Sequence, residues 1–253
     1  MKSSVNQSWI RQTRANTHAR LRLFCFAHSG GGASFFRNWG ESIGTDIDVY
    51  SLQLPGRENR RSEPPFTQFT PLIETLADVL LPYMDLPFAF FGHSLGALIS
   101  FELARQLRRQ GRRGPAQLFV SGRRAPHIPR LETSIVSLPD SEFIAEIQRF
   151  HGTAPEVLQN KEVMELFLPL LRADFSLYES FVYASERALH CPISVFGGDD
   201  DTEVSLENLM AWKVHTSSMF KLHIFPGDHF FLRKAEVQIL QIINRDVAFF
   251  LDF

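Results

Sequence analysis

Short runs of hydrophobic residues alternate along the chain with stretches in which apolar residues recur at helical spacing. The runs are rich in β-branched and aromatic residues, which predicts buried strands at residues 21–27, 47–54, 88–91, 117–121, 192–198 and 220–225. Helical spacing predicts helices from about residue 33 and at 71–86, 95–107, 206–215 and 234–253. Strands that alternate with helices indicate an α/β fold with a mostly parallel, doubly wound sheet. In such sheets the active site lies at the carboxyl ends of the strands.

The alternation breaks between about residues 126 and 189. The predicted elements here are a helix over 141–150 capped by Asp140, a turn at 154–158, and a long helix over 161–183 kinked at Pro169. The long helix is apolar on nearly every side, which suits either an inserted lid that lines an acyl or aryl pocket or a small satellite core without a ligand. We favour the lid, because insertions at strand carboxyl ends lie over the chemistry. We therefore predict one domain over 1–253, with a lid insertion at about 126–189.

The composition suits a large α/β domain that binds no polyanion. The chain has 253 residues, of which 44% are hydrophobic, and a formal net charge of -2. That charge exerts no global pull towards nucleic acid or a membrane surface. Cys25 and Cys191 lie in or beside apolar runs and cannot form a disulfide framework, which favours a reducing cytoplasm. The N-terminal segment lacks an apolar signal sequence, and no apolar stretch is long enough to span a membrane.

A candidate nucleophile lies where the apolar run at 88–91 meets the helix that follows it. Residues 92–96 read Gly-His-Ser-Leu-Gly, a G-x-S-x-G pentapeptide. In a nucleophile elbow this sequence makes a sharp turn that lifts the serine hydroxyl clear of the sheet, and the glycines avoid collisions with the turn and the neighbouring strand. The alternative is that Ser94 only caps the helix. The strand before it and the helix after it favour the nucleophile.

A glycine-rich turn over residues 28–32, His-Ser-Gly-Gly-Gly, follows the first predicted strand. Such a turn could cradle a phosphate, but neither G-x-x-x-x-G-K-[ST] nor G-x-G-x-x-G is present. We therefore favour an oxyanion loop, with the backbone N–H groups of Ser29 and Leu95 as the expected donors on position alone. His28 and His93 are expected to line the site without titrating in catalysis. No histidine shows metal-ligand spacing.

A serine nucleophile needs a histidine base and a carboxylate that orients the base. His229 follows a late strand through a Pro-Gly turn and is the expected base. Three aspartates after the strand at 192–198 compete as the acid. Asp201 is favoured because its setting resembles Gly-x-x-Asp-x-x-Val, but Asp199 and Asp200 stay open. Asp228 adjoins the histidine in sequence and is poorly placed to reach its Nδ1.

Blocks of residues along the chain resemble the type II thioesterases that accompany polyketide synthases and nonribosomal peptide synthetases, relatives of the mammalian medium-chain fatty acyl thioesterase. The resemblance runs from about residue 21 to the last helix. It rests on FCFAHSGGG, LQLPGRENRR, FAFFGHSLGALISFELA, FVSGRRAPH, LPDSEFIAEIQRFHGTAPEVL, VMELFLPLLRADF, VFGGDDDTEVS, AWKVHTS and FPGDHFFL. The chain departs from the family at Ala27 and Ser29, where proline and alanine are usual, and at Asp228, where glycine is usual.

The resemblance implies the α/β-hydrolase fold and a cytosolic editing hydrolase. Such an enzyme clears stalled or wrong acyl groups from the phosphopantetheine arm of carrier domains in polyketide and nonribosomal peptide antibiotic biosynthesis. It implies Ser94, Asp201 and His229 as the catalytic triad, no metal or organic cofactor, and acyl or peptidyl carrier domains as partners. We expect a monomer that binds neither nucleic acid nor membrane.

Two rival functions fit the same residues. A triad alone does not distinguish a carrier-specific thioesterase from a general acyl-CoA thioesterase, a carboxylesterase or an acyltransferase of the same fold. A protein of another class, which binds carrier domains with an idle site, would not need the serine, acid and histidine together. The intact set therefore favours an enzyme.

Arginines gather at the ends of two predicted strands. Arg57, Arg60 and Arg61 follow one strand, and Arg123 and Arg124 follow another. Carrier domains of the resembled family are acidic and their pantetheine arm carries a phosphate, so these five side chains would guide docking if they lie at the rim of the site. The alternative is that they are solvated surface charges.

Overall fold

The computed structural model describes residues 8–130, 133–148 and 161–250. Its strands are β1 (Ile10–Gln12), β2 (Leu21–Phe26), β3 (Ile47–Leu52), β4 (Phe88–His93), β5 (Gln117–Ser121), β6 (Ile193–Gly198) and β7 (Phe220–Phe225). Its α-helices are α2 (Trp39–Ser42), α3 (Phe69–Leu80), α4 (Leu95–Arg109), α5 (Asp140–Gln148), α7 (Lys161–Glu179), α8 (Leu206–Met210) and α9 (Glu236–Ala248). Short 3₁₀ turns are η1 (Ala33–Phe36), η2 (Glu58–Arg60), η3 (Leu81–Tyr83), η4 (Ala211–His215) and η5 (Phe231–Arg233).

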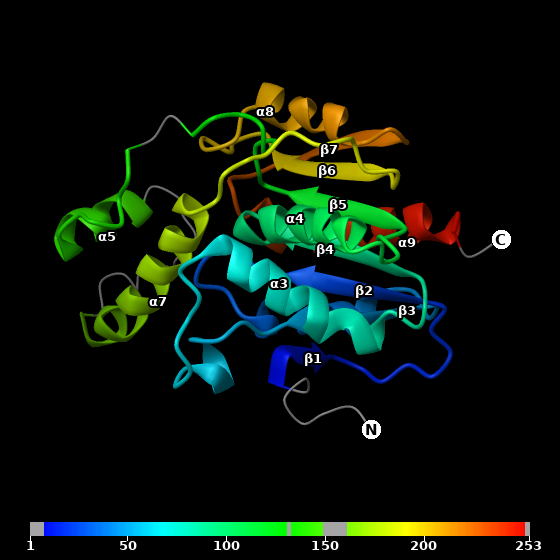
Figure 1. Cartoon of the computed structure of the whole chain (residues 1–253), viewed down its shortest axis with the longest axis horizontal. Helices are drawn as coiled ribbons and strands as arrows, with labels where there is room; N and C mark the ends of the chain where they lie inside the picture. Colours follow the sequence, from blue (N-terminus) through cyan, green and yellow to red (C-terminus); the bar gives the residue numbers. More distant parts are fainter. Residues whose placement is uncertain (1–7, 131–132, 149–160, 251–253) are drawn as a thin grey trace.

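The strands form one seven-stranded sheet in the order β1-β3-β2-β4-β5-β6-β7. β1 runs antiparallel to β3, and the other neighbouring pairs are parallel. Figure 1 shows α3 and α4 on one face of the sheet and α9 on the other, with α5 and α7 beyond the carboxyl ends of the central strands. The predicted α/β fold with a mostly parallel, doubly wound sheet is therefore confirmed.

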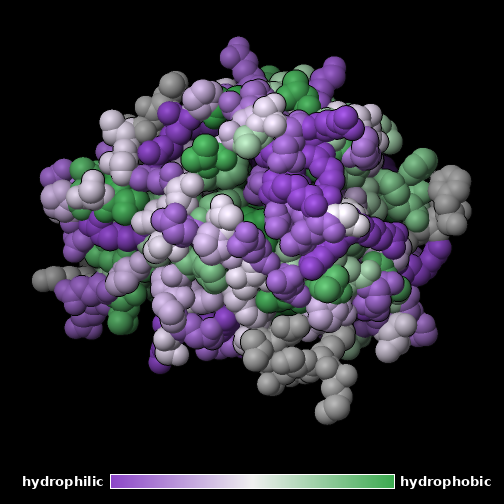
Figure 2. Space-filling view, viewed as in Figure 1, coloured by the Kyte–Doolittle hydropathy of each residue, from purple (hydrophilic) through white to green (hydrophobic). Residues whose placement is uncertain are grey.

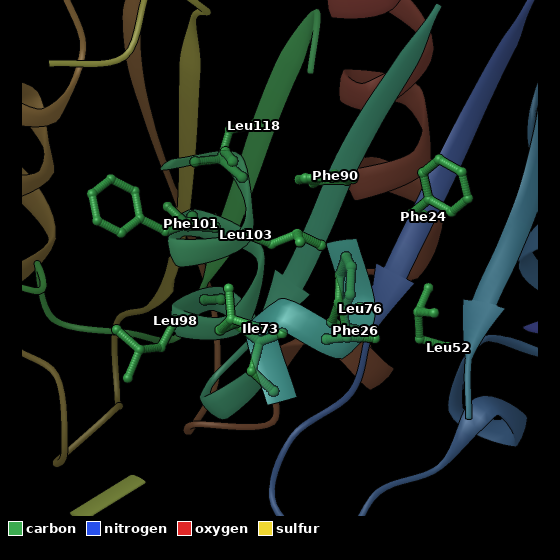
Figure 3. Packing of buried hydrophobic residues seen from close by; sticks show 14 of the residues in the cluster. Phe24, Phe26, Leu52, Ile73, Leu76, Phe90, Leu98, Phe101, Leu103 and Leu118 are labelled. Atoms are coloured by element: carbon green, nitrogen blue, oxygen red, sulfur yellow. The ribbon is translucent and has the colours of Figure 1, made fainter. Parts of the chain in front are cut away.

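Hydrophobic clusters cover the sheet on both faces. Successive side chains of a strand point to opposite faces, so Phe90 of β4 belongs to the cluster with α3 and α4, and Phe91 belongs to the cluster with α9. Figure 3 shows Phe24 and Leu103 beside Phe90 in the first of these layers. All residues of β2 to β6 are buried. Burial on both faces explains why the predicted strands read as continuous apolar runs.

The N-terminal strand β1 is not predicted by the hydrophobic pattern. It has three residues, of which Ile10 is buried, and it pairs with the edge of β3. Trp9 precedes it and is also buried, with the guanidinium of Arg60 over its ring at 4.2 Å. One inward-facing residue makes no alternating hydrophobic pattern, so the sequence of this segment does not predict a strand. The strand forms because it pairs with β3.

Two predicted helices are shorter than their patterns suggest. The helix expected over 71–86 is α3 followed by the 3₁₀ turn η3, where Pro82 supplies no N–H for a further α-helical hydrogen bond. The helix expected from residue 33 is the 3₁₀ turn η1 followed by the short α2. In both places the apolar spacing is correct, but the segment is not one continuous α-helix.

The region between β5 and β6 contains the two helices expected for a lid. Asp140 lies within the first turn of α5 and does not precede it as a cap; its Oδ1 accepts a hydrogen bond from Arg172 of α7 at 2.6 Å. Pro169 lies inside α7, which ends at Glu179 and not at residue 183. The turn expected at 154–158 lies outside the described residues.

The arginines at the end of α4 are paired with carboxylates. Arg105, Arg108 and Arg109 form ion pairs of 2.6–2.9 Å with Glu102 and Glu186. Figure 2, which views the face covered by α3 and α4, shows a hydrophilic area over the region of α4. Because the carboxylates offset most of this charge, the arginine-rich sequence here makes a mixed surface network and not a site for a polyanion.

Gly96, near the start of α4, packs tightly against the backbone at the end of β2, and its replacement tests this packing. A Cβ on Gly96 would lie 2.1 Å from the carbonyl oxygen of Phe26. We expect Gly96→Ala to lower the free energy of unfolding by about 3 kcal/mol, because the atom it meets is backbone and β2 or α4 must shift. Gly114→Ala is the matched control, since a Cβ there meets nothing within 4 Å. Urea denaturation of both variants measures the difference, and equal stabilities would contradict the close approach.

Candidate active site

Ser94 stands at a strained turn between β4 and α4. Its backbone has φ 54° and ψ -113°, a region that non-glycine residues rarely enter. The Ser94 N–H donates to the carbonyl of Ser121 at 2.8 Å, which fixes the turn to the end of β5. A Cβ at Gly92 would lie 2.1 Å from the carbonyl oxygen of Gly96, so the turn requires glycine there. These features agree with the geometry of a nucleophile elbow.

His229 lies in the turn after β7 and contacts a carboxylate from the turn after β6. Its Nδ1 is 2.8 Å from Oδ2 of Asp201, and both side chains are almost fully buried. The other oxygen of Asp201, Oδ1, accepts hydrogen bonds from the backbone N–H groups of Glu203 at 2.9 Å and Val204 at 3.2 Å. The carboxylate is therefore fixed in orientation, and it holds the His229 ring with Nδ1 as the donor.

The other aspartates near this pair have different partners. Asp199 is exposed, and its Oδ1 accepts from the Gly227 N–H at 2.9 Å. Asp200 is exposed and bonds through its backbone N–H to the Gly227 carbonyl. Asp228 accepts from the Phe230 N–H at 2.8 Å. Among the candidates that the sequence left open, Asp201 is thus the one whose carboxylate contacts the histidine.

The glycine-rich turn lies beside Ser94, and two of its amides are already hydrogen-bonded. The Gly30 N–H donates to Asp174 Oδ2 at 2.6 Å, and the Gly31 N–H donates to the His28 carbonyl at 2.9 Å. Ser29 lines the same cavity as Ser94. The expected oxyanion donor is therefore beside the expected nucleophile, and the two amides that follow it are committed to other acceptors.

Two further histidines surround His229 and are held neutral. The rings of His93 and His229 have centroids 5.2 Å apart, and the centroids of His28 and His93 are 6.0 Å apart. Burial lowers the pKa of His93 well below its usual value, with the charge of His229 as a further cause. Burial and then the charge of Arg233 lower the pKa of His28 to about 3. Both rings are therefore uncharged at neutral pH. His28 lines the cavity as expected, but His93 is fully buried and does not line it.

A cavity of about 270 Å³ joins these residues to the lid helices. Ser94 and His229 line it, together with Leu171, Phe175 and Tyr178 of α7. The lid helices also have a small hydrophobic cluster of their own, in which Leu171 takes part. The region thus contains a satellite core whose side chains also line the cavity, and its action as a lid stays a prediction.

The arginines expected at the rim divide into two groups. Arg123 and Arg124 are half-buried and line the cavity, and the guanidinium of Arg123 lies 4.0 Å from the ring centroid of Tyr178. Arg57 and Arg60 are buried and paired, with Asp174 and Glu63 respectively. Neither alternative holds for these two, since a buried and paired guanidinium is not a solvated surface charge and cannot meet a docking partner. Arg61 is exposed.

Residues 21–247 match the protein family described as "Thioesterase domain". The chain belongs to this family. The match covers nearly all the described elements after β1, including the turns that carry Ser94, Asp201 and His229. The chain is also 44% identical over 245 residues to the gramicidin S biosynthesis protein GrsT of Aneurinibacillus migulanus, an alignment that covers 97% of this chain and 95% of that protein. The thioester hydrolase class follows from family and relatives together.

Solved structures give the same result for the fold. The type II thioesterase BorB from the borrelidin biosynthetic cluster superposes with a TM-score of 0.86 at 36% identity, covering 94% of this chain and 97% of that one. RedJ, a thioesterase from the prodiginine biosynthetic pathway in Streptomyces coelicolor, superposes with a TM-score of 0.84 at 35% identity, covering 91% and 87%. The thioesterase chain thus has the α/β-hydrolase fold that its sequence implies. None of its described helices is long and apolar enough to cross a membrane.

The contact between Asp174 and Arg57 was not expected from the sequence, which offered Arg57 only as a docking residue. Both side chains bond to the glycine-rich turn, although neither lines the cavity. One signal for Asp174 is present in the sequence: a carboxylate stands inside the apolar run FLPLLRADF, where an unpaired charge would be costly. Its partner could not be named, because Arg57 is 117 residues away in the chain.

Proposed function

We propose that this thioesterase hydrolyses acyl thioesters on the phosphopantetheine arm of carrier domains, with Ser94 as nucleophile, His229 as base and Asp201 as the orienting acid. The observation that carries the proposal is the 2.8 Å contact between His229 Nδ1 and Asp201 Oδ2 in the cavity that Ser94 also lines. A histidine that donates through Nδ1 presents Nε2 as a base, which is the tautomer that activates a serine hydroxyl.

The reaction follows from this arrangement in two halves. Ser94 Oγ attacks the thioester carbonyl while His229 Nε2 takes its proton, and the resulting oxyanion is stabilised by the N–H groups of Ser29 and Leu95. The C–S bond then breaks, the acyl group stays on Ser94, and the imidazolium returns the proton to the departing thiolate. Water attacks the acyl-serine by the same route, with His229 again as base, and releases the acid. These steps need only side chains, backbone N–H groups and water.

The carrier-domain substrate is supported by the relatives and by the shape of the cavity. GrsT and BorB are named for a peptide antibiotic and a borrelidin gene cluster respectively. Leu171, Phe175 and Tyr178 offer an apolar wall to an acyl group, and the lid would cover it. The proposal includes editing of stalled or wrong acyl groups and a cytoplasmic setting. The free thiols of Cys25 and Cys191 support that setting.

Rates on matched substrates test the proposed substrate class. We expect kcat/KM to be higher for an acyl group on a carrier domain than for the same acyl group on N-acetylcysteamine or on a matched oxygen ester, because the carrier adds binding contacts outside the cavity. Added salt should reduce the advantage of the carrier by screening charges. Equal kcat/KM for the carrier and the small thiol, insensitive to salt, would leave a general thioesterase.

Charge reversal at the mouth of the cavity tests where the carrier docks. Arg124→Glu should lower kcat/KM for the carrier substrate more than for the small thiol. Arg11→Glu is the control, because Arg11 is an exposed arginine on the edge strand β1, which β3, β2 and β4 separate from β5. If both variants affect the two substrates alike, docking does not depend on this charge.

A further inference from the structure

A buried ion pair beside the glycine-rich turn has no role yet in the function proposed above. Arg57 follows β3, and Asp174 lies on the lid helix α7. The pair is bidentate, with Nη2 to Oδ1 at 2.7 Å and Nη1 to Oδ2 at 3.0 Å. Arg57 is 5% exposed and Asp174 is fully buried. Removing two charges from water costs free energy that a well-packed apolar pair would not, so stability alone is a weak explanation for this pair.

Both members of the pair contact the turn that precedes the nucleophile. Asp174 Oδ2 accepts from the Gly30 N–H at 2.6 Å, and Arg57 Nη1 donates to the Gly31 carbonyl at 2.9 Å. Gly30 has a positive φ of 76°, and Cδ2 of Leu171 lies 2.8 Å from where a Cβ on Gly30 would stand. The lid helix is thus in direct contact with this turn through both a charge and an apolar side chain.

These contacts fix the direction of the proposed oxyanion donor. The peptide between His28 and Ser29 carries the Ser29 N–H on one side and the His28 carbonyl on the other, and a trans peptide is planar. The His28 carbonyl accepts from the Gly31 N–H at 2.9 Å. Holding Gly30 and Gly31 therefore holds this peptide, and with it the direction in which the Ser29 N–H points.

We propose that Asp174, together with Arg57, is a positioning residue that aims the Ser29 N–H at the substrate carbonyl while α7 is docked on the turn. The inference rests on the proposed function, because it requires Ser29 to stabilise the oxyanion. Leu171 and Phe175, which line the cavity, lie three residues before and one residue after Asp174 on the same helix. An acyl group that contacts them therefore touches the same helix that holds the oxyanion loop.

Asp174→Ala is the direct test, measured on an acyl-N-acetylcysteamine so that carrier docking plays no part. We expect kcat to fall by about 10-fold to 100-fold with little change in KM, because a displaced oxyanion donor acts on the transition state and not on substrate binding. The affinity for an acyl trifluoromethyl ketone, whose adduct with Ser94 places an oxyanion in the hole, should fall by a similar factor. The affinity for an uncleavable thioether analogue should stay close to that of the wild type.

Two further variants separate positioning from folding. The double variant Arg57→Met with Asp174→Leu removes both charges, so it should regain thermal stability over Asp174→Ala, but its kcat should stay low because both contacts to the turn are gone. Arg172→Ala removes a different tether of α7, which binds the carbonyls of Val136 and Leu138 and the carboxylate of Asp140. Its kcat per folded enzyme should stay close to that of the wild type.

Three results would overturn the positioning role. They are an unchanged kcat per folded Asp174→Ala enzyme, an equal loss of affinity for the ketone and the thioether, or a double variant that regains kcat together with its stability. An inactive wild-type enzyme would overturn the proposed function and this inference together. An active wild-type enzyme whose kcat is unchanged by substitution of Asp174 would overturn the positioning role alone.

Discussion

Replacing Ser94 by alanine should remove nearly all thioester hydrolysis while leaving the protein folded. Loss of a member of a serine-histidine-acid unit costs about four to six orders of magnitude in kcat, because no other group forms the acyl-enzyme. The strained backbone at Ser94 is held by the Ser121 carbonyl and the close contact of Gly92 with Gly96, and alanine keeps these contacts. The change in stability should therefore be small.

The measurement compares single-turnover hydrolysis of an acyl thioester with covalent labelling by a fluorophosphonate, read by mass spectrometry. Wild-type enzyme should gain one label, and Ser94→Ala should gain none. Ser100→Ala is the matched control, since Ser100 is buried on α4, the helix that follows Ser94. Its hydroxyl donates to the Ala97 carbonyl at 2.9 Å, and it does not line the cavity. Hydrolysis by a pure Ser94→Ala sample within tenfold of the wild-type rate would reject Ser94 as the nucleophile.

The parts of the site that could be read from the sequence are those made by consecutive residues. The elbow is local: the aromatic run of β4, the pentapeptide at 92–96 and the apolar spacing of α4 lie within one stretch of chain. The favoured acid was also chosen on local spacing, and Asp201 is the aspartate that contacts His229. The roles of these residues in catalysis stay predictions.

The parts that could not be read are contacts between distant segments. The hydropathy of an arginine is the same whether it is solvated or buried in an ion pair, so the sequence could not separate Arg57 and Arg60 from Arg61. For Arg57 the distinction comes from Asp174, on a helix that the chain reaches only after β5. For Arg60 it comes from Trp9, whose ring centroid lies 4.2 Å from the guanidinium. The strand β1 could not be predicted for the same reason. It has one buried residue, and it forms a strand because it pairs with β3.

Asp201→Asn should be the most damaging of the three aspartate-to-asparagine changes, with a loss in kcat of about four orders of magnitude. The structure gives the reason. The Oδ1 position accepts from the N–H groups of Glu203 and Val204, so an asparagine keeps its oxygen there and turns its NH₂ towards His229. The ring nitrogen Nδ1 must then accept a hydrogen bond, which leaves the proton on Nε2 and removes the base that faces the serine.

Asp199→Asn and Asp200→Asn serve as controls, because they make the same change in side-chain size and charge as Asp201→Asn. An asparagine at 199 still accepts from the Gly227 N–H through its oxygen, and Asp200 is exposed, so both variants should keep a kcat within about threefold of the wild type. All three are compared at equal folded fraction, with the imidazole nitrogens of His229 followed by ¹⁵N NMR to read the tautomer. A greater loss of kcat in Asp199→Asn or Asp200→Asn would require another acid. So would an inactive Asp201→Asn in which the His229 tautomer is unchanged, because Asp201 would then not be the residue that orients Nδ1.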